Sequence, residues 1–116
     1  MDLELKSKTE GDSNKIVLVC TIGLLEALKA KVLTTNECEQ YLFSPYSVSI
    51  LNRKGIDRKV VEIIEFACEL EDVESLRPER LDANIDYLIN KAKERIKSIE
   101  FDPNFNIKRK WLDEDQ

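Results

Sequence analysis

The second half of the chain contains a run in which apolar residues recur every three or four positions. An α-helix has 3.6 residues per turn, so this spacing places them all on one face. Acidic residues come early in the run and basic residues late, an order that the helix macrodipole favours. We therefore expect a long amphipathic helix whose apolar face consists of Leu81, Ile85, Leu88, Ala92, Ile96 and Ile99.

Two capping signals predict short helices near the middle of the chain. Thr34 and Glu37 have the spacing of a capping box, which predicts a helix over 35–42. Ser44 can cap a helix over 46–53, because the proline that follows it suits a first helical position.

A further helix is predicted between Asp57 and about Leu70. Gly55 can close the preceding helix in the left-handed conformation. Asp57 is placed to cap a helix that continues to about Leu70. Residues 72–76 then form a connection or a short helical turn. Pro78 must lie in the first turn of the last helix, since a deeper position would break it.

The beginning of the chain allows two interpretations. Ser13 or Asn14 can cap a helix that continues to about Leu33. The β-branched residues within 15–20 would also suit a strand. The length of the apolar pattern favours the helix.

These elements predict the fold class. The chain of 116 residues has only three glycines and three prolines, which argues against a turn-rich β architecture. We expect an all-α, single-domain bundle of four to five helices over 1–116, with its core at about 15–100. The terminal segments 1–12 and 102–116 are expected to be tails or short extended segments.

The sequence also indicates a compartment. The acidic start predicts no secretory signal, and three widely spaced cysteines fit reduced thiols, so we expect a cytoplasmic protein.

Composition argues against several kinds of chemistry and several classes of partner. Histidine is absent, and no glycine-rich loop or close cysteine pair occurs. We therefore expect no enzymatic activity, no cofactor and no metal. A net charge of −5 argues against nucleic-acid and membrane partners, despite the basic run at 108–110.

The negative charge is concentrated in one part of the chain. Residues 57–86 carry ten acidic and four basic side chains, whereas 1–56 are balanced. On a continuous helix, four of these acids would share one stripe, and two more would extend it. The stripe is either a solvated face or a surface that binds a basic protein. Its residues are Glu62, Glu65, Glu69 and Asp72, extended by Glu71 and Glu74.

Two tyrosines are candidates for an apolar part of such a surface. Tyr41 and Tyr46 lie on either side of the Ser44-Pro45 corner. They either pack the corner or anchor a partner, because tyrosine is enriched at the centres of interfaces.

Three motifs resemble a known family. Phe-Ser-Pro-Tyr at 43–46, Gly-Ile-Asp at 55–57 and Leu-Glu-Asp-Val-Glu-Ser-Leu at 70–76 are similar to those of small bacterial proteins of uncharacterised function. The similarity covers roughly 16–99. It implies a mostly helical protein without catalytic residues. Small acidic relatives are further expected to be immunity proteins of contact-dependent or polymorphic toxin systems.

The resemblance and the charge together give one main hypothesis. The protein would be a non-enzymatic immunity protein that neutralises a basic toxin domain, such as a nuclease, through its acidic surface. The alternative is a helical adaptor or regulatory protein that acts through protein–protein interaction or homodimerisation.

Overall fold

The described residues, 1–104 and 106–113 of a computed structural model, form helices and connecting segments and no strand, which confirms the all-α class. Residues 15–20 lie in the first helix, so the alternative of a strand there is wrong. The helices are α1 (Glu10–Lys29), α2 (Thr35–Tyr41), α3 (Pro45–Arg53), α4 (Arg58–Ala67), α5 (Leu70–Leu76), the 3-10 turn η1 (Pro78–Arg80) and α6 (Leu81–Lys97).

Both ends of α1 differ from the sequence prediction. The helix begins earlier, because the Thr9 hydroxyl accepts a hydrogen bond from the Asp12 amide at 3.0 Å and caps it. It also ends before Leu33, at Lys29. Lys31 adopts a φ of 62°, and the amides of Lys31 and Val32 donate back to carbonyls of the last turn. This ending normally requires glycine, so a lysine gave no signal for it.

The short helices begin where their caps predicted. The Glu37 amide donates to the Thr34 hydroxyl at 3.1 Å, and the Thr34 amide donates to the Glu37 carboxylate at 3.0 Å. The Ser44 hydroxyl accepts from the Ser47 amide at 3.2 Å at the start of α3. Gly55 closes α3 with a φ of 79°. These local signals are read correctly because each involves neighbours in sequence.

The helix that Asp57 caps is not continuous to Leu70, as the sequence had suggested. It ends at Ala67, and α5 begins at Leu70 after a two-residue turn. Neither glycine nor proline marks this break. The turn lets α5 pack against both α2 and α6 while Ala67 and Leu70 stay buried, with 2% and 3% of their surface exposed. Tertiary packing therefore overrides local helical propensity here.

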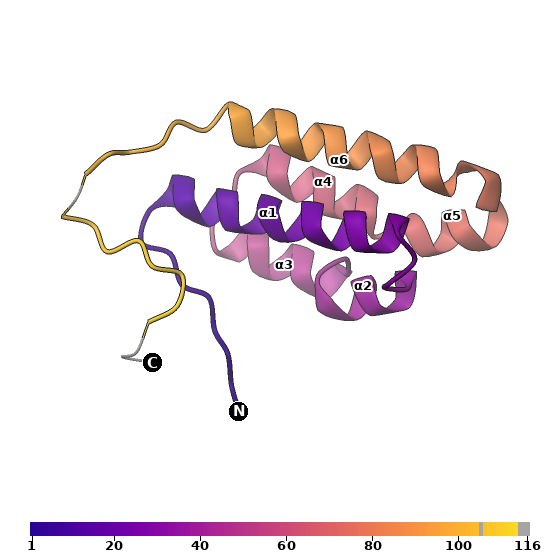
Figure 1. The fold of residues 1–116 in the computed structure, drawn as a ribbon, viewed down its shortest axis with the longest axis horizontal. Coiled ribbons are helices and arrows are strands. Elements are labelled where there is room, and N and C mark those ends of the chain that lie inside the picture. The colour runs from indigo at the N-terminus through magenta and orange to yellow at the C-terminus, as the bar shows by residue number, and fades with distance from the viewer. Residues whose placement is uncertain (105, 114–116) are drawn as a thin grey trace.

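The core lies between α1, α4 and α6. Figure 1 shows α6 running antiparallel to α1, with α4 packed against both. Each helix contributes one apolar face to the same cluster. The aliphatic residues at its centre are Leu18, Leu25, Val60, Ile64, Ile85 and Leu88. Phe66 also lies on α4, but 57% of its surface is exposed.

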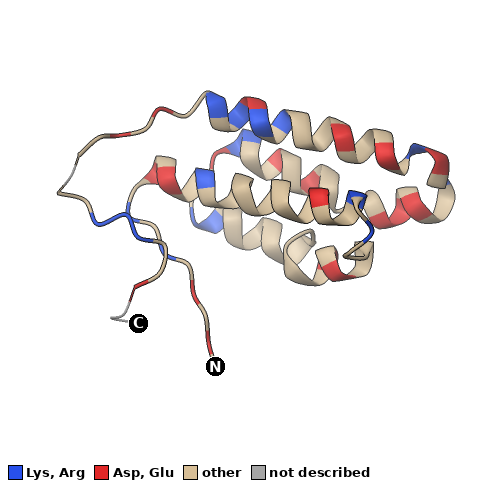
Figure 2. Ribbon diagram, viewed as in Figure 1, with Lys and Arg blue, Asp and Glu red and all other residues tan. Residues whose placement is uncertain are grey.

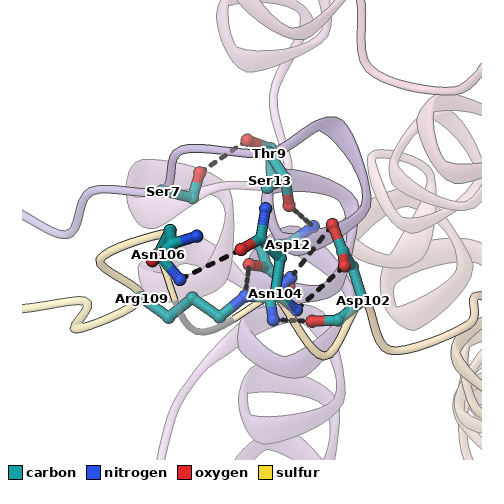
Figure 3. Close-up of polar contacts among 8 residues, drawn as sticks. All are labelled: Ser7, Thr9, Asp12, Ser13, Asp102, Asn104, Asn106 and Arg109. Atoms are coloured by element: carbon teal, nitrogen blue, oxygen red, sulfur yellow. Dashed lines mark hydrogen bonds and ion pairs between the residues drawn. The ribbon is translucent and has the colours of Figure 1, made fainter.

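The two terminal segments lie together at the start of α1 rather than forming separate tails. The Lys6 amide donates to the Trp111 carbonyl at 2.9 Å. The Arg109 side chain donates to the Asp12 carboxylate at 2.8 Å and to the Asp102 carbonyl (Figure 3). Its guanidinium group also lies 4.5 Å from the centre of the Phe101 ring. Residues 10–12 belong to α1, which corrects the predicted terminal segment 1–12.

Candidate protein-binding surface

The six predicted acidic residues fall into two groups with different surroundings. Glu62 and Glu65 lie on α4, where Arg58 pairs with both carboxylates, at 3.8 Å and 2.7 Å respectively. A cation at this distance offsets much of the local negative charge. The break before α5 also means that the predicted stripe is not a single helix face.

The second group gathers at the end of the molecule where α2 meets α5. Glu69 lies in the turn before α5, and the other three acids lie on α5 itself. The structure adds Glu39 of α2 to this group, which we name the acidic end. Helical spacing could not reveal Glu39, because it lies about thirty residues earlier in the chain. The acidic end therefore consists of Glu39, Glu69, Glu71, Asp72 and Glu74.

Within the acidic end, the surroundings of Glu71 raise its pKa above the ordinary carboxyl value. This pKa is raised first because the protonated carboxyl group hydrogen-bonds to Glu39. The negative charge of Glu39, desolvation and the charges of Asp72 and Glu74 raise it further. A proton held between Glu39 and Glu71 reduces the repulsion between their negative charges. A basic side chain from another molecule would reduce the same repulsion.

Figure 2 shows the acidic end against the charge of the whole molecule. Acidic residues crowd α5, whereas Lys and Arg occupy the last turns of α6 at the opposite end. Within the part of the chain that the structure describes, no ion pair joins a basic side chain to the acidic end. The buried Thr35 hydroxyl donates to the Glu74 carboxylate at 2.8 Å.

Apolar side chains are also exposed on the neighbouring elements. Leu76, four residues after Asp72 on α5, is 77% exposed. Tyr41 and Tyr46 are 62% and 75% exposed, so neither is buried in the corner between α2 and α3. Leu76 shares a helix face with part of the acidic end, whereas Tyr46 lies on a different helix, at the start of α3.

A second surface feature, which the sequence did not predict, lies between α6 on one side and α4 and α5 on the other. Two hollows of 390 Å³ and 300 Å³ share Phe66, Tyr87 and Leu88 and so form one groove, which we name the aromatic groove. The Phe66 and Tyr87 rings meet edge to face with centroids 6.3 Å apart. Helical spacing could not reveal this pair, because Phe66 and Tyr87 lie on different helices.

The cysteines and carboxylates were the remaining candidates for a reactive or metal-binding group. Burial raises the pKa of the thiols of Cys20, Cys38 and Cys68, so each is neutral at physiological pH. Among residues 1–104 and 106–113, no three or more His, Cys, Asp or Glu side chains are arranged to hold a metal ion. In the same residues, no helix is both long and apolar enough for a bilayer span.

Comparison with known proteins gives a family. Neither a curated protein nor a solved structure matches the chain. A family model described as "Protein of unknown function (DUF3969)" matches residues 8–113, a range that includes every helix from α1 to α6. The match covers nearly the whole chain, and the chain therefore belongs to this family of proteins of unknown function.

Proposed function

We propose that this protein is a non-enzymatic immunity protein, which binds a basic bacterial toxin domain through the acidic end and neutralises it. The observation that carries this proposal is the Glu39–Glu71 pair. Its two carboxylates come from different helices and are held close enough to raise the pKa of Glu71. Such a pair costs folding stability at neutral pH, and a cationic partner would relieve that cost.

The chemistry of the acidic end suits a partner that handles phosphates. A nuclease surrounds its substrate with Lys and Arg, and clustered carboxylates can occupy the same cations. Long-range attraction between opposite charges also speeds association, which benefits an inhibitor that must act before the toxin does. Exposed Leu76 supplies an apolar contact beside the carboxylates.

The test first identifies the binding partner and then measures whether the protein protects cells from it. The tagged protein is used to isolate bound proteins from the source cells, and native mass spectrometry follows the complex at low and raised salt. The domain found in the complex is then expressed in cells, either by itself or together with this protein. We expect a one-to-one complex whose affinity falls as the salt concentration rises. We also expect the domain to be toxic only when this protein is absent.

Paired charge reversals locate the interface. Glu39→Lys with Glu71→Lys changes the acidic end, whereas Glu62→Lys with Glu65→Lys makes the same change on α4. We expect the first variant to lose protection, mainly through a slower association rate, and the second to retain most of it. A bound domain that is harmless, or full protection by the Glu39/Glu71 variant, would reject the proposal.

The alternative function, an adaptor or regulatory protein that acts through homodimerisation, is favoured by a different observation. The aromatic groove exposes two rings, and neither Glu39 nor Glu71 lines it. Exposed aromatic clusters are typical of protein interfaces. Isolation of a homodimer alone, unaffected by the Glu39/Glu71 reversal, would favour this function.

A further inference from the structure

The centre of the aromatic groove is apolar and open to solvent. Phe66 and Tyr87 expose 57% and 50% of their surface, and they stand above the buried side chains of Ile63 and Leu88. Aromatic rings are large apolar groups that are usually buried, but about half of the surface of these two rings faces water. Covering this pair would remove a continuous apolar strip from solvent.

The two ends of the aromatic groove carry opposite charge. The hollow at one end is lined by Lys59, Lys91 and Arg95 and by the acids Glu62 and Glu94. Lys91 pairs with Glu94, Arg95 with Asp57 and Glu62 with Arg58. Among the described residues, Lys59 is therefore the cation of this lining whose charge no ion pair offsets. The hollow at the other end contains Glu69 and no basic side chain. The same polarity extends across the molecule, from the basic last turns of α6 to the acidic α5 (Figure 2).

This arrangement is complementary to itself. Consider a twofold axis that lies in the plane of the interface, runs perpendicular to α4 and α6, and passes the Phe66–Tyr87 pair. This axis would place two copies face to face with their helices antiparallel. The basic end of each groove would then lie over the acidic end of the other, and the aromatic pairs would meet at the centre. An isologous interface requires such self-complementarity, and antiparallel α6 helices would also oppose their macrodipoles favourably.

We propose that the aromatic groove binds a second copy of this chain, in a symmetric antiparallel dimer. The size of the face fits an exchangeable dimer. A helix of the length of α6 extends about 25 Å, and two adjacent helices present a face about 20 Å wide, so each copy covers roughly 500 Å² in projection. This area lies at the lower end of specific interfaces. Glu69 belongs to both the acidic end and the groove, but Glu39 and Glu71 do not line the groove, so the dimer does not depend on the proposed function.

The experiment uses two charge reversals at opposite ends of the groove. Lys59→Glu and Glu69→Lys both change exposed side chains, and circular dichroism checks that each variant folds. Sedimentation velocity on the full chain, from low micromolar to millimolar concentration, gives the dissociation constant of the dimer. In each variant alone, like charges would face each other twice, so we expect dimerisation to weaken about tenfold or more.

Mixing the two variants is the decisive step. In a mixed dimer both cross-contacts pair a lysine with a glutamate, so native mass spectrometry should show mostly the mixed species.

Two single variants serve as controls. Lys93→Glu, which makes the same charge change on α6 outside the groove, should dimerise with the wild-type dissociation constant. Tyr87→Ala, which removes one ring of the pair, should weaken dimerisation. A wild-type chain that stays monomeric throughout, or a mixture with no preference for the mixed dimer, would overturn the proposal.

Discussion

The side chain of Asn14, buried within α1, accepts a hydrogen bond at 3.0 Å from the backbone amide of Asp57, the residue that caps α4. The Asp57 carboxylate in turn accepts from the Lys59 amide at 2.8 Å and from the Arg95 side chain of α6. These bonds, first from Lys59 and then from Arg95, lower the pKa of Asp57. One polar network therefore joins the three helices that surround the core.

Replacement of Asn14 should destabilise the fold. Asn14→Ala removes the acceptor and leaves the Asp57 amide without its partner at a partly buried site. We expect a loss of about 1–3 kcal/mol in the free energy of unfolding, measured by urea denaturation at neutral pH. Asn90→Ala on the exposed face of α6 is the matched control and should change stability little. Equal effects of the two variants would contradict a structural role for this hydrogen bond.

The Glu39–Glu71 pair should make stability depend on pH. Because the pKa of Glu71 is raised on folding, the folded state binds its proton more tightly than the unfolded state. The resulting stabilisation is present below the ordinary carboxyl pKa and is lost as pH rises through the folded pKa. Glu71→Gln mimics the protonated form, so we expect its melting temperature to exceed that of the wild type at neutral pH and to converge with it in acid.

Glu62→Gln provides the control for this titration. Glu62 pairs with Arg58, so its neutralisation removes a weak attraction rather than a repulsion. No gain in melting temperature is expected at neutral pH. If Glu71→Gln gained the same stability at every pH, repulsion within the acidic end would not be the cause.

The contacts of Arg109 should hold the C-terminal segment against α1. Arg109→Gln removes the charge that pairs with Asp12, and the segment should then separate more often from the N-terminal residues. Hydrogen exchange at the Lys6 amide reports this directly, because that amide donates to the Trp111 carbonyl. We expect faster exchange at Lys6 in Arg109→Gln, and wild-type exchange in the exposed control Lys110→Gln. Unchanged protection in both variants would show that Arg109 does not secure the segment.

The sequence predicted most of the acidic residues of the candidate surface, but it did not predict their division into two groups or the contribution of Glu39. The concentration of acids in 57–86 is a property of the sequence and needs no structure. The division between α4 and α5, the neutralisation of Glu62 and Glu65 by Arg58, and the approach of Glu39 to Glu71 depend on how the helices pack. The aromatic groove likewise depends on the relative placement of α4 and α6.

The sequence by itself determined the all-α class, the starts of α2, α3 and α4, and the sign of the charge. Each of these follows from interactions between residues a few positions apart, such as the capping box of Thr34 and Glu37. The tertiary structure decided where α1 ends, where the helix after Asp57 breaks, and that Arg109 reaches Asp12 across almost the whole chain. These features depend on contacts between distant segments, and their energies outweigh local propensity only once the core has formed.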